Sequence, residues 1–486
     1  MPLLTDLLAS VSEKPEAQVL LNVTGISADS RKIQSGNLFV ALQGSKAAGA
    51  DYVMAARKAG AIAVLCAMDL QLPECGVPVI RVANPRLALA QLAAAFYPKQ
   101  PEHMVAITGT DGKTSTADFF RQFWHHMGKK SASFGTLGTL SGAGEVLAAG
   151  THTTPDPVEL HRVLAEMVAK NISHVAMEAS SHGLHQYRLD GVRLEAAAFT
   201  NIARDHLDYH KNEEDYFAAK LRLFSELLPT GKTAVLNADD VRFAVLSEIC
   251  ARRNITVMDF GRNAKSLRID SLTPHNTGQH AKLMLMGKLY TLDIPLVGGF
   301  QVMNILAALG LSVVVGADME GSISVISKFK GVPGRLEHVA TLANGASVYV
   351  DYAHTPMALA NILQTLRPHT PNKLHVVFGC GGDRDAGKRP EMGKVAARLA
   401  DNVIITDDNP RSERPELIRS AIKAAAPTAK EVADRKEAIY VALQMLEPND
   451  ILVIAGKGHE KTQIVGDKVL PFDDVEIARQ AAGGLQ

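Results

Sequence analysis

Residues 109–115 read Gly-Thr-Asp-Gly-Lys-Thr-Ser, between an apolar run at 104–108 and a segment at 115–127 whose large apolar residues recur at helical spacing. A strand, a glycine turn, a lysine and a helix form an arrangement that holds phosphate. The glycines let backbone N–H groups turn toward an anion, and the helix start adds donors and a favourable dipole. The full P-loop pattern has a glycine where Ile107 stands. The sequence therefore predicts a shortened phosphate-binding loop, with an ordinary strand-to-helix turn as the alternative.

Composition narrows the class of protein. A chain of 486 residues is too long for one core and suggests about three domains. Lys+Arg and Asp+Glu both number 51, so no basic field indicates nucleic acid as a partner. The four cysteines lack CxxC spacing, which disfavours a zinc site or a disulfide framework and favours a reducing cytoplasm. The N-terminus lacks a signal-peptide pattern, and no apolar run is long enough to span a membrane, so we expect a cytoplasmic protein without membrane insertion.

The pattern along the chain predicts an α/β fold in three domains, at residues 1–90, 91–332 and 333–486. The first domain reads as a small α/β unit. The second alternates strands and helices, which is typical of a largely parallel sheet with helices on its faces. Within it, residues 262–297 resemble a β-hairpin insertion centred on a glycine. The third domain reads as a doubly wound, Rossmann-like unit after a hinge at 331–337.

The expected first domain has a definite order of elements. Strands or strand ends are predicted at 26–31 and 37–42, a helix at 51–59 leads into an apolar run at 61–66, and a second helix is expected at 85–97. Two polar turns, at 29–31 and 44–46, are explained locally as surface turns held by side-chain to backbone hydrogen bonds.

Chemistry-bearing residues of the second domain lie where ligands of a parallel sheet bind, at the carboxyl ends of its strands. Glu178 ends an apolar run and is a reasonable Mg²⁺ ligand beside a phosphate loop, although a helix-capping or ion-paired role is the alternative. Asp205 and His206 follow the next run. Lys220 shares a helical face with apolar residues, where a lysine ordinarily extends its ammonium to solvent. Asn304 is either a contact for a base or a helix N-terminal residue.

Four apolar runs of the third domain each end in glycine or charge, at residues 348–354, 376–384, 403–411 and 451–460. Turns also favour Asp, Asn, Gly and Pro, so any single tip could be a simple turn. Four polar tips at one edge of a doubly wound sheet indicate a binding crevice.

Eight motifs spread over nearly the whole chain resemble, in the right order, those of the Mur ligases. They are the loop at 109–115, Thr-Thr-Pro-Asp at 153–156, Glu-Ala-Ser-Ser-His-Gly-Leu at 178–184, Asp-His-Leu-Asp-Tyr-His at 205–210, Asp-Tyr-Ala-His-Thr-Pro at 351–356, Gly-Cys-Gly-Gly-Asp-Arg-Asp at 379–385, Asp-Asn-Pro-Arg at 408–411 and Gly-Lys-Gly-His-Glu at 456–460. The resemblance implies a uridine-nucleotide domain, a central ATPase domain and a C-terminal amino-acid domain. It also implies a monomeric enzyme of cytoplasmic peptidoglycan precursor synthesis.

The resemblance further implies a role for individual positions. The residues that match contacts to ATP are Gly109, Thr110, Asp111, Gly112, Lys113, Thr114, Ser115, Asn304, Arg335, Asp351 and His354. Those that match contacts to the UDP-muramoyl dipeptide are Ser30, Ser45, Lys46, Ala47, Thr153, Thr154, Ser180, Gln186 and Arg188. Those that match the diaminopimelate site are Arg384, Asp408, Asn409, Pro410, Arg411, Gly456 and Glu460.

The same resemblance assigns the metal and catalytic groups. Thr114, Glu178 and Lys220 would serve Mg²⁺, with Lys220 carbamylated to N6-carboxylysine, which replaces the expectation of a solvent-directed lysine. The implied catalytic set is Lys113, Glu178, His206, Lys220 and Arg335.

Arg411 selects between amino acids. Diaminopimelate differs from lysine by a second carboxylate, which a guanidinium pairs with in bidentate fashion. The sequence departs from the family pattern at two positions: Asp111 stands where asparagine is common, and Arg414 where an acidic residue is usual. Unless the Asp111 carboxylate faces Mg²⁺ or solvent, it should weaken ATP binding.

The implied reaction is ATP-dependent addition of meso-diaminopimelate to UDP-N-acetylmuramoyl-L-alanyl-D-glutamate through an acyl phosphate. Alternatives are a lysine-adding ligase of the same family, a kinase or nucleotide hydrolase with the same loop, and a non-catalytic nucleotide-binding module. Because the implied ATP contacts fall in two domains, we expect the third domain to close onto the second during turnover. Solution scattering that shows no compaction with ATP analogue and substrate would contradict this expectation.

Overall fold

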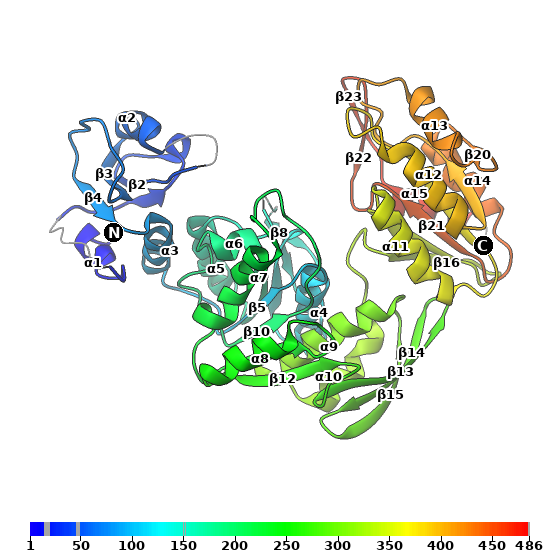
Figure 1. The fold of residues 1–486 in the computed structure, drawn as a ribbon, viewed down its shortest axis with the longest axis horizontal. Helices are drawn as coiled ribbons and strands as arrows, with labels where there is room; N and C mark the ends of the chain where they lie inside the picture. The colour runs from blue at the N-terminus through cyan, green and yellow to red at the C-terminus, as the bar shows by residue number, and fades with distance from the viewer. Residues whose placement is uncertain (14–19, 45–48, 149, 151, 485–486) are drawn as a thin grey trace. The chain divides into compact units, whose positions relative to one another are not determined.

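The computed structural model describes residues 1–13, 20–44, 49–148, 150 and 152–484. The chain forms two compact units (Figure 1): residues 1–264 with 304–323, and residues 265–303 with 324–486. Both units are α/β, as the sequence predicts. In the part of the chain that the structure describes, no helix is both long and apolar enough to cross a membrane.

The first unit begins with a small parallel sheet. Its order is β1 (Gly25–Ser27), β2 (Asn37–Ala41), β3 (Ala61–Ala67) and β4 (Val79–Val82). The accompanying helices are α1 (Leu4–Leu8), α2 (Val53–Lys58), α3 (Pro85–Phe96) and the short 3₁₀ segments η1 (Ser30–Lys32) and η2 (Gly49–Tyr52). Separate apolar clusters cover the two faces, so β2 is buried along its whole length, as expected of a strand with both faces covered.

The polar turn predicted at 29–31 is confirmed. β1 ends at Ser27 and Ser30 begins η1, because the Asp29 carboxylate accepts the Arg31 N–H at 3.0 Å and turns the chain. Residues 45 and 46 of the other predicted turn lie outside the described residues.

The larger sheet of the first unit carries the glycine loop. Its order is β12 (Thr256–Gly261), β11 (Thr233–Asn237), β10 (Ala196–Phe199), β5 (His103–Thr108), β9 (His174–Glu178), β6 (Ser131–Gly135), β7 (Gly138–Ser141) and β8 (Val146–Ala148). The six strands from β12 to β6 are parallel, and β7 and β8 add an antiparallel edge that the sequence did not reveal. β5 is therefore an inner strand, and its carboxyl end meets those of β9 and β10.

Helices on this sheet begin at readable signals. They are α4 (Lys113–His126), α5 (Pro157–Ala169), α6 (Ser181–His185), α7 (Glu213–Arg222), the π-helical η3 (Leu223–Leu227), α8 (Phe243–Arg252), α9 (Gly299–Val314) and α10 (Met319–Val325). At α5, for example, the Asp156 side chain accepts N–H groups of the first turn and Pro157 follows directly.

The second unit contains a doubly wound sheet of order β16 (Glu337–Thr341), β17 (Ser347–Asp351), β21 (Ile451–Ala455), β18 (Leu374–Phe378), β19 (Asn402–Ile405) and β20 (Lys430–Glu431). One face packs on α11 (Pro356–Leu366), α12 (Lys388–Leu399) and α13 (Pro415–Lys423), and the other on α14 (Arg435–Gln444) and α15 (Asp474–Gly483). The short elements are η4 (Ile326–Lys328), η5 (Arg367–His369) and the hairpin β22 (Thr462–Val465) with β23 (Lys468–Pro471). Each of the four predicted polar runs ends one of its parallel strands.

The predicted hairpin insertion at 262–297 has three strands, so the expectation of two is wrong. β13 (Leu267–His275), β14 (Gly278–Leu285) and β15 (Lys288–Ile294) form an antiparallel ladder. The glycine-centred turn lies between β14 and β15, and a second tight turn at 276–277 joins β13 to β14. The sequence signal at this second turn is weak because no glycine occupies its centre.

Candidate active site

The glycine loop lies between β5 and α4 and requires glycine at two positions. Gly109 has φ +147°, and Gly112 has φ +83° at the start of α4. A Cβ on Gly112 would lie only 2.3 Å from Asn304 Oδ1 on α9. The neighbouring strand end fixes the loop, because the Thr200 hydroxyl donates to the Asp111 carbonyl at 2.6 Å and the Asp111 N–H donates to Asn201 Oδ1 at 3.0 Å. The N-terminus of α4 is thus presented by a rigid turn, which is the geometry that binds phosphate.

Two lysines converge on this loop. Lys113 Nζ donates to the Gly109 and Thr110 carbonyls at 2.9 and 2.7 Å, and Lys220 Nζ donates to the Gly109 carbonyl at 2.6 Å. Lys220 is only 1% exposed, so it does not extend to solvent as the local pattern alone suggested. Burial lowers the pKa of both lysines, to about 6 for Lys220, where the charge of Lys113 adds to the effect. Burial therefore favours the uncharged amine form of Lys220.

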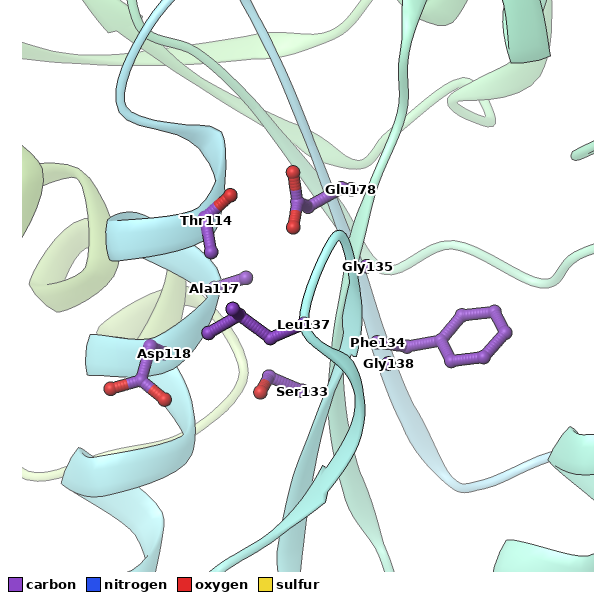
Figure 2. Close-up of a pocket in the computed structure, with 9 residues that line it drawn as sticks. All are labelled: Thr114, Ala117, Asp118, Ser133, Phe134, Gly135, Leu137, Gly138 and Glu178. Carbon is purple, nitrogen blue, oxygen red and sulfur yellow. The ribbon is translucent and has the colours of Figure 1, made fainter. Parts of the chain in front are cut away.

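Glu178 and Thr114 line one small pocket between α4 and the turn that joins β6 to β7 (Figure 2). Glu178 Oε1 accepts the Thr136 N–H at 2.8 Å, and Oε2 accepts the Thr136 hydroxyl at 3.2 Å. Burial raises the pKa of Glu178, and the Lys113 charge and hydrogen bonds from Thr136 and Thr114 oppose that rise. The Thr114 hydroxyl and the Glu178 carboxylate carry oxygen atoms, which are the ligands that Mg²⁺ prefers. The helix-capping alternative for Glu178 does not fit, because its carboxylate accepts from Thr136, which lies in the turn between β6 and β7.

Residues expected to contact the muramoyl peptide lie next to Glu178. The Thr154 hydroxyl donates to the Glu178 carbonyl at 2.8 Å and lies 3.0 Å from the Ser180 hydroxyl. Arg188 donates to the Thr154 carbonyl and, at 2.8 Å, to Gln186 Oε1. The Thr153 hydroxyl lies 3.0 Å from that of Thr136. The structure thus brings all five expected positions, Thr153, Thr154, Ser180, Gln186 and Arg188, to one edge of the sheet.

His206 lies in a group of aromatic rings. Its backbone has φ +52°, and its ring meets that of His182 edge-on at 4.9 Å. Tyr216 is a member of the site that the sequence interpretation missed: its hydroxyl lies 3.1 Å from that of Thr110, and its ring lies 4.4 Å from Lys220 Nζ. The available signal was its position four residues before Lys220, on the same face of α7.

The uridine site is only partly described. Ser30 begins η1 beside the small sheet, and Ser45, Lys46 and Ala47 lie outside the described residues. Their role in binding uridine stays a prediction.

The second unit collects the remaining nucleotide positions at the end of β17. The Asp351 carboxylate accepts the Leu336 and Ala353 N–H groups, each at 2.7 Å, and burial raises its pKa. The Arg335 guanidinium lies 5.3 Å from the centre of the Tyr352 ring, and the His354 ring lies 4.6 Å from that ring. Tyr352 therefore links the predicted residues, although the sequence interpretation assigned it no role.

The Asp-Asn-Pro-Arg motif and the Gly-Lys-Gly-His-Glu motif form one polar cluster. Asn409 Nδ2 donates to Glu460 Oε2 at 3.0 Å, and a Cβ on Gly456 would lie 2.5 Å from Asp408 Oδ2. Lys457, which the sequence interpretation passed over, is fully buried and donates to Asn409 Oδ1 at 3.0 Å and to Glu460 Oε2 at 3.4 Å. A buried cation thus holds the amide and the carboxylate in place.

Arg411 is held at the rim of the same cluster. Its backbone has φ +52°, and its guanidinium donates to the Gly382 carbonyl at 2.8 Å. Gly382 permits the close approach of Pro410, whose carbonyl oxygen would lie 1.9 Å from a Cβ there. Arg384 is exposed on the neighbouring loop. Four donor groups of the Arg411 guanidinium stay available for a carboxylate beyond this one bond.

Asp111 and Arg414, the two residues that differ from the family pattern, are both exposed. The Asp111 side chain lies at the surface, and Arg414 is 77% exposed at the start of α13. The Asp111 carboxylate thus meets the condition under which it leaves ATP binding undisturbed.

A glycine loop with two converging lysines, together with a separate cluster of amide and charged side chains, is the arrangement expected of a nucleotide-using ligase. Three family models match consecutive parts of the chain: Mur ligase family, catalytic domain, at 22–97; Mur ligase middle domain at 107–312; and Mur ligase, glutamate ligase domain, at 334–458. The chain belongs to the Mur ligase family.

One curated relative and two solved structures are similar to this chain over nearly its whole length. The chain is 50% identical over 467 residues to the UDP-N-acetylmuramoyl-L-alanyl-D-glutamate–2,6-diaminopimelate ligase of Brucella melitensis biotype 1, covering 96% of this chain and 95% of the relative. A solved structure of a ligase with the same name superposes with a TM-score of 0.76 at 33% identity over 96% of each chain. The MurF ligase of Thermotoga maritima, solved in complex with ADP, shares the fold with a TM-score of 0.60 at 17% identity, over 94% of this chain and 97% of that chain.

Proposed function

We propose that the chain is an ATP-dependent ligase that joins meso-diaminopimelate to UDP-N-acetylmuramoyl-L-alanyl-D-glutamate in peptidoglycan precursor synthesis. The observation that carries the proposal is Arg411. Its guanidinium donates to the Gly382 carbonyl at 2.8 Å, and the Gly382 N–H donates to the Asn409 carbonyl, in a chain half identical to a relative named for this reaction. Lysine lacks the second carboxylate that such an arginine would bind.

The first half of the reaction belongs to the glycine loop. The γ-phosphoryl group of ATP passes to the γ-carboxylate of the D-glutamyl residue, which gives an acyl phosphate and ADP. Lys113 and the N–H groups at the start of α4 offset the charge on the transferred group, as does Arg335 in this assignment. Positioning and charge stabilisation are most of what a protein contributes to phosphoryl transfer.

Thr114 and Glu178 would hold Mg²⁺, because the Thr114 hydroxyl hydrogen-bonds the Glu178 carboxylate and both groups offer oxygen ligands, with Lys113 nearby. When bound, the metal neutralises phosphate charge. Lys220 suits carbamylation, because an uncharged amine is the form that adds to CO₂ and burial lowers its pKa to about 6. The carbamate would replace a buried neutral group by an anion near Lys113, with His206 helping to organise that charge.

The second half of the reaction is attack by the amine of diaminopimelate on the acyl phosphate. A tetrahedral intermediate forms and phosphate leaves, with one new amide bond and one proton released from the amine. Asn409, Glu460 and Arg384 would orient the amino-acid end of the substrate. Arg411 would pair with the distal carboxylate of diaminopimelate. This pairing would hold the reacting amine at a fixed distance from Arg411.

The decisive experiment incubates the full chain with ATP, Mg²⁺, the uridine-linked muramoyl dipeptide and either diaminopimelate or lysine. We expect a product whose mass gain matches diaminopimelate. Arg411→Ala should reduce diaminopimelate transfer at least tenfold, equivalent to about 1.4 kcal/mol, whereas Arg414→Ala, an exposed arginine three residues away, should not. Equal transfer of lysine would favour the lysine-adding alternative.

Phosphate release separates the ligase from a kinase or a plain hydrolase. A ligase releases phosphate in step with amide formation and only slowly without the amine. Phosphate release that does not depend on diaminopimelate would support the hydrolase. Nucleotide binding with neither phosphate release nor amide formation would support a non-catalytic binding module. In this proposal the enzyme acts as a cytoplasmic monomer, which size-exclusion with light scattering tests directly.

A further inference from the structure

Three metal-ligating side chains meet on the antiparallel ladder of the second unit, in none of the sites assigned above. They are His275 on β13, His280 on β14 and Asp293 on β15, and their ligand atoms all lie within 4.8 Å of one another. His275 Nε2 lies 2.9 Å and His280 Nδ1 3.0 Å from the same Asp293 oxygen, Oδ1. Three ligands from three strands thus converge on one point.

The strand register explains why these side chains share a face. His280 is the direct cross-strand partner of Asp293, and His275 pairs with Gly278, two residues before His280. Side chains two residues apart on a strand point to the same side of a sheet. The His275 and His280 rings lie 4.8 Å apart at 38°, so their nitrogens approach the carboxylate from adjacent directions.

The backbone that carries His275 is fixed from several sides. The His369 ring donates from Nδ1 to the His275 carbonyl at 2.8 Å, and the Tyr349 hydroxyl donates to the Asn276 carbonyl at 2.6 Å. Asn276 Nδ2 donates to the Gly345 carbonyl at 2.8 Å. The backbone of His275 is therefore held in place before any metal binds. This lowers the entropy lost when a metal ion binds.

The second nitrogen of His275 also has a partner. Nδ1 lies 3.3 Å from the Thr277 hydroxyl. Metal-ligating histidines characteristically donate the proton of their other ring nitrogen to such a group, which sets the tautomer. Without metal, each histidine can donate a proton to Asp293; with metal, each ring carries that proton on its other nitrogen, at His275 toward Thr277 and at His280 toward solvent.

We propose that His275, His280 and Asp293 form a binding site for one divalent transition-metal ion, of which Zn²⁺ is the expected species. Two imidazoles and one carboxylate are a ligand set that Zn²⁺ accepts at about 2.0–2.2 Å, with solvent in the fourth position. The His280 and Asp293 side chains are 63% and 60% exposed, so an ion reaches the site without unfolding. Mg²⁺ prefers oxygen ligands. The two histidine nitrogens therefore distinguish this site from the proposed Mg²⁺ site at Thr114 and Glu178. The bound ion would link all three strands of the ladder.

The test uses the full-length chain stripped of metal with a chelator and titrated with Co²⁺ in the presence of excess Mg²⁺. Co²⁺ bound to imidazole gives visible ligand-field absorption, and Zn²⁺ displaces it. We expect one such site in the wild-type chain, at least tenfold weaker in His280→Ala and in Asp293→Asn. His125→Ala, which removes a surface histidine of the first unit, is the matched control and should bind as the wild type does. Thr277→Val should weaken binding through the tautomer of His275.

Circular dichroism and the Tm of each metal-free variant establish that it folds, and Asp293→Asn preserves the side-chain shape if His280→Ala proves unstable. Zn²⁺ should raise the Tm of the wild-type chain and not that of Asp293→Asn. Identical Co²⁺ spectra and Zn²⁺ stoichiometry in the wild type and both cluster variants would overturn the proposal, as would a wild-type chain that takes up no Zn²⁺ at micromolar concentration. Neither readout uses ligase activity, so the result is independent of the proposed function.

Discussion

At the scale of single residues, burial changes the chemistry of a lysine beside the phosphate loop by lowering its pKa. Lys113 and Lys220 both donate to the Gly109 carbonyl, and the proximity of two ammonium groups in a desolvated loop is unfavourable. Burial and the charge of Lys113 lower the pKa of Lys220 to about 6, which favours its uncharged form. An uncharged lysine is the form that can be carbamylated.

We predict that Lys220→Met reduces ligation at least a hundredfold, equivalent to about 2.7 kcal/mol of transition-state stabilisation, because no anion then forms beside the phosphate loop. Lys211→Met, which changes an exposed lysine just before the same helix, should leave the rate unchanged. Wild-type activity should fall as pH drops through about 6, where the folded lysine takes up a proton, and should respond to added bicarbonate. An unaltered rate in Lys220→Met would contradict the assignment.

Lys457 is a second buried lysine, in the second unit, where it donates to Asn409 and Glu460. We predict that Lys457→Met raises the KM for diaminopimelate about tenfold and leaves the KM for ATP unchanged, because the Asn409 amide and Glu460 lose the cation between them, at a cost of about 1–3 kcal/mol. Lys461→Met, which removes an exposed partner of Asp473, is the control. Steady-state kinetics with each substrate varied in turn decide the matter, and equal changes in both KM values would argue for general unfolding instead.

At the scale of elements, a glycine at each end of helix α4 has a positive φ of nearly the same value, but the two glycines have different surroundings. Gly112 has φ +83°, and a Cβ added there would meet Asn304. Gly128, just beyond the other end of α4, has φ +77°, and a Cβ added there would have no other atom of the described residues within 4 Å. Substituting each glycine therefore distinguishes the cost of a left-handed backbone, which both positions share, from the cost of a steric clash, which only Gly112 has.

We predict that Gly128→Ala costs about 1–2 kcal/mol of unfolding free energy, the usual cost of a left-handed backbone for an L-residue. Gly112→Ala should cost more and should also abolish ATP binding, because its Cβ displaces Asn304 and the loop. Urea denaturation and nucleotide binding by calorimetry measure the two effects. Equal losses in both variants would show that strain alone accounts for the glycine at 112.

Sequence patterns predicted the elements unevenly. The central strand, the glycine turn and helix α4 were correct, as were the four parallel strands of the second unit, because buried parallel strands read as continuous apolar runs. β7, β8 and β13 were missed. They are short or partly exposed, with mixed burial, so their alternation is weak and their pairing depends on the neighbouring strand.

At the scale of the whole molecule, each unit carries its own core and its own polar cluster. In the second unit, Arg435 on α14 and Asp474 on α15 form a fully buried pair at 2.7–2.8 Å, and Arg435 also donates to the Ala455 carbonyl at the end of β21. This pair ties two helices to the strand that leads into Gly456.

We predict that Asp474→Ala destabilises the second unit by about 3–5 kcal/mol, because it leaves a buried guanidinium without its partner. Glu447→Ala, which breaks an exposed pair with Lys373, should have a far smaller effect. Differential scanning calorimetry should show a lower transition temperature in Asp474→Ala. An unchanged thermogram would indicate that water or Asp408 compensates the charge.

The sequence by itself determined the class of fold, the loop and the order of eight motifs, because strand and helix periodicity and glycine requirements are local properties of the chain. Its resemblance to the Mur ligases also implied that Arg411 is the selective residue, because a guanidinium pairs with the second carboxylate of diaminopimelate. Only the tertiary structure decided what burial controls: that Lys220 is desolvated, that Glu178 faces Thr114, and that Lys457 holds Asn409 and Glu460. The same holds for His275, His280 and Asp293, which meet only through strand register. Desolvation and proximity arise between segments far apart in the sequence, and no local pattern encodes them.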